Sequence, residues 1–274
     1  MSYILILRPF NCLFVGLTVL FGAWYRNIIV LNIGVLAAVL SAMLIAAGGY
    51  VINDYYDIEI DRINKPDRIL PSGKIRRDKA FLYSLVLFIS GFLISFLTSS
   101  VYCILLALVN SILLYFYAAL WKKSFLVGNL LVAYAAGSTF IYGGLAAANL
   151  INSIIISLFA MIYTLLREIT KDSEDVTGDK QAGARTLALE LGEQKTWTIS
   201  LLPVLFIAVF PFFLYSYNFY SISTLILMEI LVTIPLITMM MFIKISKDPG
   251  KYSLSSRLMK IDMLILLIIN WIGK

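Results

Sequence analysis

Four residues with oxygen-bearing side chains, Asn53, Asp54, Asp57 and Asp61, follow a long apolar stretch. Asn53, Asp57 and Asp61 are spaced i, i+4 and i+8, so they line one face if the preceding helix continues through them, with Asp54 about a quarter-turn away. Neighbouring carboxylates repel each other, but a hard divalent cation such as Mg²⁺ binds carboxylates together with substrate phosphate. This first motif therefore predicts a magnesium–diphosphate site, against the alternative of a solvated helix end.

A second motif, Asp172, Asp175 and Asp179, has the spacing i, i+3 and i+7 and also follows a long apolar stretch. Two acidic faces from distant parts of the chain can hold Mg²⁺ ions that bridge one diphosphate and neutralise a leaving pyrophosphate. The predicted metal ligands are Asn53, Asp54, Asp57, Asp61, Asp172, Asp175 and Asp179. The residues predicted to be catalytic are Asp57, Asp61, Asp175 and Asp179.

Basic residues near both motifs are candidate contacts to a diphosphate. Lys65 and Arg68 lie in a segment rich in turn formers directly after the first motif, which suits a loop that closes over an anion. Lys171 and Arg185 flank the second motif. Each of these two is either a phosphate contact or a charge that only sets membrane topology.

Lys122 and Lys123 interrupt a long apolar region. They serve as a topology signal, or they reach back to the diphosphate through their flexible stems.

The composition is that of a membrane protein. Of 274 residues, 61% are hydrophobic and 14% are charged, and the mean hydropathy is +0.90, whereas soluble domains are about a quarter charged. The chain contains no histidine, which excludes imidazole catalysis and His-ligated metals. Cys12 and Cys103 lie inside apolar stretches and predict neither a disulfide nor a metal site.

Uncharged stretches of about 20 residues predict an all-α, polytopic protein with nine transmembrane helices around a central cavity. The expected helices are 9–25, 27–52, two within 80–121, two within 124–166, two within 196–243, and 255–272. Small residues, among them Gly48-Gly49 and Gly143-Gly144, either allow close approach of helices or leave room for the apolar tail of a substrate.

The charged residues predict an orientation and an internal repeat. All but two of the 22 basic residues, Arg26 and Lys274, fall on one side of the nine helices, which is cytoplasmic by the positive-inside rule. The N-terminus is then cytoplasmic, the C-terminus lies outside, and both motifs follow helices 2 and 6 on the cytoplasmic side. We predict a single membrane domain over 1–274, with pseudo-repeats of roughly 1–122 and 123–250 whose motifs face one cavity.

Both motifs, with the segment Arg62-Ile63-Asn64-Lys65-Pro66-Asp67-Arg68 and Pro71-Ser72-Gly73, resemble the UbiA superfamily of intramembrane prenyltransferases. Arg8-Pro9 and Lys122-Lys123 with Gly128-Asn129 extend the resemblance over the whole chain. It implies Mg²⁺-dependent transfer of a prenyl group from a prenyl diphosphate to a lipophilic acceptor in the membrane. It also implies that Asn53, Asp57, Asp61, Asp172, Asp175 and Asp179 hold the metal and diphosphate.

Within that family, 167–179 and 183–187 look most like the archaeal digeranylgeranylglyceryl phosphate synthases. That likeness implies transfer of a geranylgeranyl group to the hydroxyl of geranylgeranylglyceryl phosphate, which forms an ether bond in membrane lipid synthesis. The acceptor phosphate would need cations of its own, for which Arg8, Lys122 and Lys123 are candidates.

Two other functions are weighed against this one. Prenylation of an aromatic quinone precursor would use the same diphosphate chemistry. A cation transporter would instead place its acids near the middle of the membrane, whereas thirteen of the 16 acids lie in two segments at the ends of apolar stretches. No nucleic-acid partner is expected.

Overall fold

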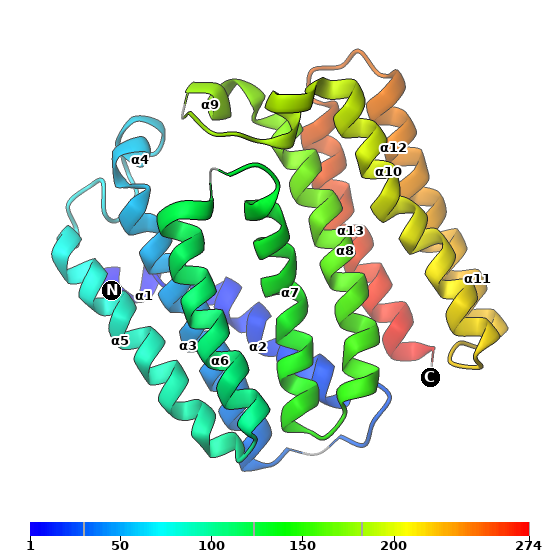
Figure 1. Ribbon diagram of the computed structural model, residues 1–274, viewed down its shortest axis with the longest axis horizontal. Helices are drawn as coiled ribbons and strands as arrows, with labels where there is room; N and C mark the ends of the chain where they lie inside the picture. Colours follow the sequence, from blue (N-terminus) through cyan, green and yellow to red (C-terminus); the bar gives the residue numbers. More distant parts are fainter. Residues whose placement is uncertain (30, 123, 182, 274) are drawn as a thin grey trace. The chain divides into compact units, whose positions relative to one another are not determined.

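The computed structural model describes residues 1–29, 31–122, 124–181 and 183–273. All secondary-structure elements within these ranges are helices, as the all-α prediction requires (Figure 1). The chain forms two compact units, of which the first comprises Met1–Lys122 and Gly137–Ser157 and the second Lys123–Ala136 and Leu158–Lys274.

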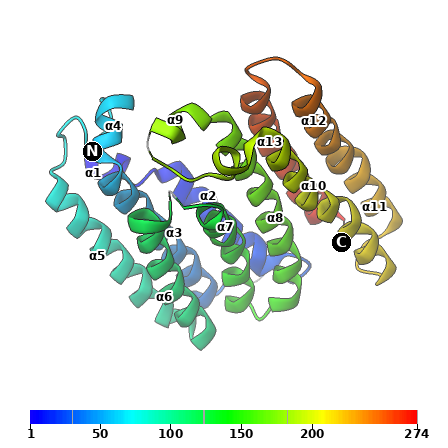
Figure 2. The same cartoon turned by 45° about the horizontal axis from the view of Figure 1, so that its top comes forward.

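Helix α3 is the centre of the first unit and packs against α2, α5 and α6. Figures 1 and 2 both show α3, α5 and α6 side by side. The elements up to Lys122 are α1 (Ser2–Leu5), α2 (Pro9–Trp24), α3 (Ile33–Tyr56), α4 (Ile58–Asn64), α5 (Arg77–Ser95), η1 (Phe96–Thr98), α6 (Val101–Phe116) and the π-helical turn η2 (Tyr117–Trp121). Helices α7 (Val127–Ala146) and α8 (Leu150–Glu174) each contribute residues to both units.

Glycines let α2 and α7 touch through their backbones. A Cβ at Gly143 would lie 1.8 Å from the carbonyl oxygen of Val19, and one at Gly22 would lie 2.0 Å from that of Phe140. The predicted close approach at Gly143 is therefore confirmed. Asn149 secures the same contact, because its Nδ2 donates to the carbonyl oxygens of residues 22, 23 and 25 at 2.8–3.3 Å.

The second unit consists of α9 (Val176–Gln181), α10 (Leu187–Ser216), α11 (Ile222–Met228), η3 (Glu229–Thr233), α12 (Ile234–Ile245) and α13 (Lys251–Ile272), with parts of α7 and α8. Buried polar contacts tie α13 to its neighbours. Tyr163 of α8 donates to Oδ2 of Asp262, and Tyr220 donates to Oδ1 of Asn270 at 2.5 Å. A buried carboxylate needs such a partner, because an unpaired one would cost several kcal/mol of stability.

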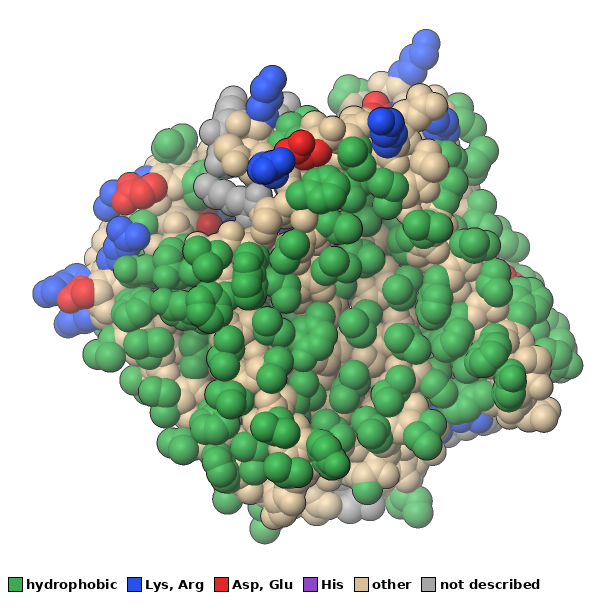
Figure 3. All heavy atoms as spheres, viewed as in Figure 1, with side chains coloured by type: hydrophobic (Ala, Val, Ile, Leu, Met, Phe, Trp, Pro, Cys, Tyr) green, Lys and Arg blue, Asp and Glu red, His purple; other side chains and the backbone are tan. Residues whose placement is uncertain are grey.

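Apolar side chains cover the lengths of the helices, as expected for a protein surrounded by lipid. Figure 3 shows them along the helices in view, with charged side chains near helix ends. Among the described residues, six helical segments are long and apolar enough to span a membrane: Ile33–Tyr56, Arg77–Thr98, Val101–Trp121, Leu150–Glu174, Leu187–Ser216 and Ile222–Ile245. The chain is thus a multi-pass membrane protein, and the count of nine stays a prediction.

The second predicted helix differs from its expected range of 27–52. Helix α3 begins only at Ile33, because Asn32 caps it by accepting a hydrogen bond from the backbone N–H of Val35 at 2.9 Å. It continues to Tyr56, so the start of the first motif lies on its last turn.

Candidate diphosphate and metal site

The first motif spans the junction of two helices. Asn53 and Asp54 are on the last turn of α3, Asp57 lies between the helices, and Asp61 is on α4. The N–H of Asp57 donates to the carbonyl of Asn53 at 3.0 Å and that of Asp61 to the carbonyl of Asp57 at 2.8 Å. Helical hydrogen bonding therefore continues across the junction, and the motif keeps nearly helical geometry.

The side chains of the predicted row Asn53, Asp57 and Asp61 divide between two sets of contacts. Nδ2 of Asn53 donates to Oδ2 of Asp57 at 2.9 Å, so these two form one pair. Asp61 shares a cation with Asp54 instead, since Nη1 of Arg68 is 2.6 Å from Asp61 and 3.7 Å from Asp54. The helix turns by about 100° per residue, so the i, i+7 pair is only about 20° apart while i, i+8 is about 80° apart.

Three of the predicted cations contact this motif. Nη2 of Arg8 is 2.5 Å from Oδ1 of Asp54, Arg68 bridges Asp54 and Asp61, and Nζ of Lys122 donates to Oδ2 of Asp57. Arg8 was predicted to contact an acceptor phosphate, whereas in the structure its guanidinium lies on Asp54 of the first motif.

Local backbone geometry helps to place Arg8. The residue takes the left-handed conformation, with φ 54° and ψ 64°, at the start of α2. The following Pro9 disfavours the right-handed helical region for the residue before it, so the chain turns at this point. The guanidinium also lies 5.2 Å from the centre of the Tyr50 ring, which adds a cation–π contact to the ion pair.

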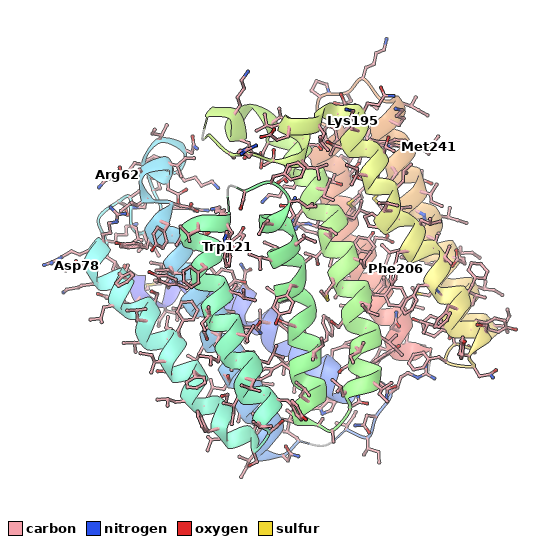
Figure 4. All side chains as sticks on the ribbon, viewed as in Figure 1. Arg62, Asp78, Trp121, Lys195, Phe206 and Met241 are labelled. Carbon is pink, nitrogen blue, oxygen red and sulfur yellow. The ribbon has the colours of Figure 1, made fainter. Side chains whose placement is uncertain are left out.

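The remaining cations predicted near this motif are placed differently. Lys65 ends α4 and is exposed, and Lys123 lies outside the described residues. Arg62 of α4, labelled in Figure 4, pairs with Glu59 at 2.8 Å. The cations that contact Asp54, Asp57 and Asp61 are thus Arg8, Arg68 and Lys122.

The acids of the first motif are more deeply buried than their cations. Side-chain exposure is 12% for Asp54, 15% for Asp57 and 8% for Asp61, against 32–35% for Arg8, Arg68 and Lys122. Buried carboxylates lose hydration and depend on their partners. The partly exposed cations can reach an incoming anion without unburying the acids.

The second motif repeats this local architecture. Asp172 is on the last turns of α8, Asp175 lies between α8 and α9, and Asp179 is on α9. The N–H of Asp175 donates to the carbonyl of Lys171 at 3.1 Å and that of Asp179 to the carbonyl of Asp175 at 2.9 Å. Figure 2 shows α9 continuing from the end of α8. The two motifs are thus the same long-helix, aspartate, short-helix element.

The first aspartate of the second motif has a neutral partner from another helix. Nδ2 of Asn129, on α7, donates to Oδ2 of Asp172 at 2.7 Å. The Asp175 side chain is exposed, and that of Lys171 is exposed as well. Asn129 had no predicted role. Its partner is 43 residues away in sequence, so no local spacing pattern could have revealed the contact.

Arg185, the other cation predicted near the second motif, pairs with Glu190. Their Nε and Oε1 atoms are 2.7 Å apart, and the arginine side chain is 73% exposed. This hydrogen bond raises the pKa of Arg185, which stays cationic. Arg185 and Glu190 line an open cavity of about 460 Å³ with Ser124, Phe125 and Leu191.

The oxygen donors in each motif fit a hard cation. Among the described residues, no three or more acidic or cysteine side chains gather closely enough to hold a metal ion by themselves. Mg²⁺ commonly takes only one or two carboxylates and completes its shell with substrate phosphate and water. Asp57 with Asn53, and Asp172 with Asp175, supply such donors.

Comparison with known proteins supports the resemblance to the prenyltransferases that the motifs indicate. The model of the UbiA prenyltransferase family matches residues 15–261. The digeranylgeranylglyceryl phosphate synthase of Saccharolobus solfataricus is 42% identical over 244 residues, covering 85% of this chain and 84% of that protein.

Two solved structures have a similar fold. One is described as digeranylgeranylglyceryl phosphate synthase in membranes, with a TM-score of 0.88, 33% identity and coverage of 99% of this chain and 97% of that one. The other is a UbiA homologue from Archaeoglobus fulgidus bound to GPP and Mg²⁺, with a TM-score of 0.71, 16% identity and coverage of 100% and 99%. At that identity the second likeness concerns the fold alone.

Proposed function

The chain belongs to the UbiA prenyltransferase family, and from that premise we propose that it makes an ether-linked membrane lipid. It transfers a geranylgeranyl group from geranylgeranyl diphosphate to the hydroxyl of geranylgeranylglyceryl phosphate. The bond between C1 and the diphosphate oxygen breaks, a bond between C1 and the glycerol oxygen forms, and pyrophosphate and the hydroxyl proton leave. The choice of acceptor rests on the relatives that carry this activity in their name over most of the chain.

The observation that carries prenyl transfer is the first motif with its cations. Arg8, Arg68 and Lys122 lie on buried carboxylates at the end of an apolar helix, where a diphosphate with a lipid tail can reach them. Arg68 can donate to phosphate oxygens through several N–H groups in a fixed plane. These cations bind and orient the leaving group, while the apolar helices exclude water from the reacting carbon.

Mg²⁺ fits the oxygen donors of both motifs and would supply charge neutralisation on the departing pyrophosphate. We assign Asn53, Asp57, Asp172, Asp175 and Asp179 to the metal and diphosphate. Asp54 and Asp61 are assigned to the positioning of Arg8 and Arg68, because both carboxylates are already engaged by guanidinium groups. In the first motif, Asn53 and Asp57 are thus assigned to the metal, and Asp54 and Asp61 to the arginines, in place of a single row of metal ligands.

The proposal requires both motifs to face one chamber on the cytoplasmic side of the membrane. The equal spacing of their aspartates and their equal local fold support a repeat with one motif in each half. The excess of basic residues on that side supports an N-terminus in the cytoplasm and a C-terminus outside, by the positive-inside rule.

A panel of acceptors tests the proposal. Purified protein in lipid nanodiscs is given geranylgeranyl diphosphate with either geranylgeranylglyceryl phosphate or an aromatic quinone precursor, with and without EDTA. The expected result is an ether product with the glycerol phosphate alone, lost with EDTA and restored by Mg²⁺. Product with the aromatic acceptor only would overturn the acceptor assignment.

A further inference from the structure

The second motif repeats the first but lacks its asparagine. In both motifs the three aspartates are spaced i, i+3 and i+7, and the middle aspartate lies between a long helix and a short one. Asn53 precedes the first aspartate of the first motif, and the matching position in the second is Lys171. A lysine can donate to a carboxylate, but it has no side-chain oxygen with which to bind a metal ion.

An amide reaches the second motif from a different helix. Nδ2 of Asn129 donates to Oδ2 of Asp172 at 2.7 Å, as Nδ2 of Asn53 donates to Oδ2 of Asp57 at 2.9 Å. Asn129 is held on the first turn of α7. That turn follows Leu126, which takes the left-handed conformation with φ 57°, and the N–H of Leu130 donates to the carbonyl of Leu126 at 3.0 Å.

Asparagines that only join helices in this protein use neutral partners. Asn149 donates to three backbone carbonyls between α2 and the α7–α8 turn. Asn110 of α6 donates to the hydroxyl of Ser138 of α7 at 3.1 Å. Asn129 instead donates to a carboxylate of the acidic motif. A hydrogen bond to an ionised acceptor is stronger and more restrictive in geometry than these neutral contacts.

We infer that Asn129 is a positioning residue for the second motif. By holding Oδ2 of Asp172 it fixes the rotation of that carboxylate and leaves Oδ1 for the metal and diphosphate. Asn129 thereby gives the second motif an amide donor from another helix, on the first aspartate, whereas Asn53 gives the first motif one from the same helix, on the middle aspartate. The inference rests on the proposed function and adds a residue from α7 to its site.

The test measures metal binding separately from turnover. Full-length protein in nanodiscs is titrated with Mn²⁺ in the presence of inorganic pyrophosphate and followed by electron paramagnetic resonance. Asn129→Leu keeps the side-chain volume and removes the amide, and Asn129→Gln keeps the amide on a longer stem. Asn110→Leu is the matched control, because it removes an interhelical amide whose partner is the neutral hydroxyl of Ser138.

Asn129→Leu is expected to weaken Mn²⁺ binding about tenfold, as for other residues that orient metal ligands, and to raise the Mg²⁺ concentration for half-maximal rate by a similar factor. Asn129→Gln should recover part of this loss, and Asn110→Leu should bind Mn²⁺ like the wild type. If Asn129→Leu fails to fold, Asn129→Ala is titrated in its place.

Unchanged Mn²⁺ affinity in the Asn129 variant overturns the inference whatever its turnover. A wild type that binds Mn²⁺ and pyrophosphate but makes no ether product overturns the proposed function, and the titration still decides the role of Asn129. A wild type that binds no Mn²⁺ with pyrophosphate overturns both.

Discussion

The two acidic motifs share a backbone and differ in their counter-charges. In the first, Arg8, Arg68 and Lys122 neutralise Asp54, Asp57 and Asp61. In the second, Asp172 accepts from the neutral Asn129 and Asp175 is exposed. One repeated element therefore carries basic side chains on its aspartates in the first unit, whereas its first aspartate accepts from a neutral amide in the second.

This difference suggests a division of labour. Arg8, Arg68 and Lys122 are held in place by carboxylates and can donate to phosphate oxygens. The first motif is therefore suited to bind the leaving diphosphate. In the second motif, the exposed Asp175 carboxylate is open to a divalent ion from solvent. We therefore expect this motif to contribute strongly to metal binding.

The largest effects are expected when the central aspartate of either motif is removed. Asp57→Ala and Asp175→Ala should each lower kcat by at least about 100-fold, because loss of a ligand to charge-neutralising metal costs several kcal/mol in the transition state. Circular dichroism should show unchanged helix content. Near-normal turnover in one variant would remove that aspartate from catalysis and break the equivalence of the motifs.

Smaller effects, on KM for the prenyl diphosphate, should distinguish Arg68 near the first motif from Lys171 near the second. Arg68→Ala is expected to raise KM for the prenyl diphosphate about 10–100-fold, since charge-assisted hydrogen bonds contribute about 1.5–3 kcal/mol. Lys171→Ala should raise it less than about threefold, because the Lys171 side chain is exposed. Steady-state kinetics over diphosphate concentration measures both, and equal changes would contradict the assignment of phosphate binding to the first motif.

Local sequence patterns were sufficient for the features that depend on neighbours in the chain. The spacing of Asn53 and Asp57 predicted a shared helix face, on which the two side chains are hydrogen-bonded, and the apolar stretches predicted an all-helical membrane protein. The same spacing did not reveal that Asp61 shares Arg68 with Asp54, which lies only about 20° from it around a helix.

Local sequence patterns could not predict contacts between segments that are far apart in the chain. Arg8 meets Asp54 over 46 residues and Asn129 meets Asp172 over 43. Both contacts depend on how helices pack, and a helix's apolar face does not specify which polar residue of a neighbour will lie beside it. The meeting of the two motifs is a packing question of the same kind and stays a prediction.

Asp54→Asn distinguishes a metal ligand from an anchor for arginine. We expect KM for the prenyl diphosphate to rise about tenfold, because Arg8 and Arg68 lose a charged acceptor. The Mg²⁺ concentration for half-maximal rate should stay at the wild-type value. A change confined to the Mg²⁺ dependence would instead return Asp54 to the set of metal ligands, and Asp57→Asn serves as the comparison that must shift it.

The smallest effect is expected for Arg185→Ala, which asks whether the second unit supplies a phosphate contact of its own. Exposed ion pairs contribute about 0–1 kcal/mol, and Arg185 with Glu190 is such a pair, so KM for either substrate should change less than about threefold. Glu190→Ala is the matched control, since it breaks the same pair and leaves the cation. A tenfold rise in KM for the glycerol phosphate in Arg185→Ala, absent in Glu190→Ala, would make the 460 Å³ cavity beside Arg185 the place where the acceptor phosphate binds. Arg185 would then be a phosphate-binding cation of the second unit, and the two units would differ in where their phosphate contacts lie.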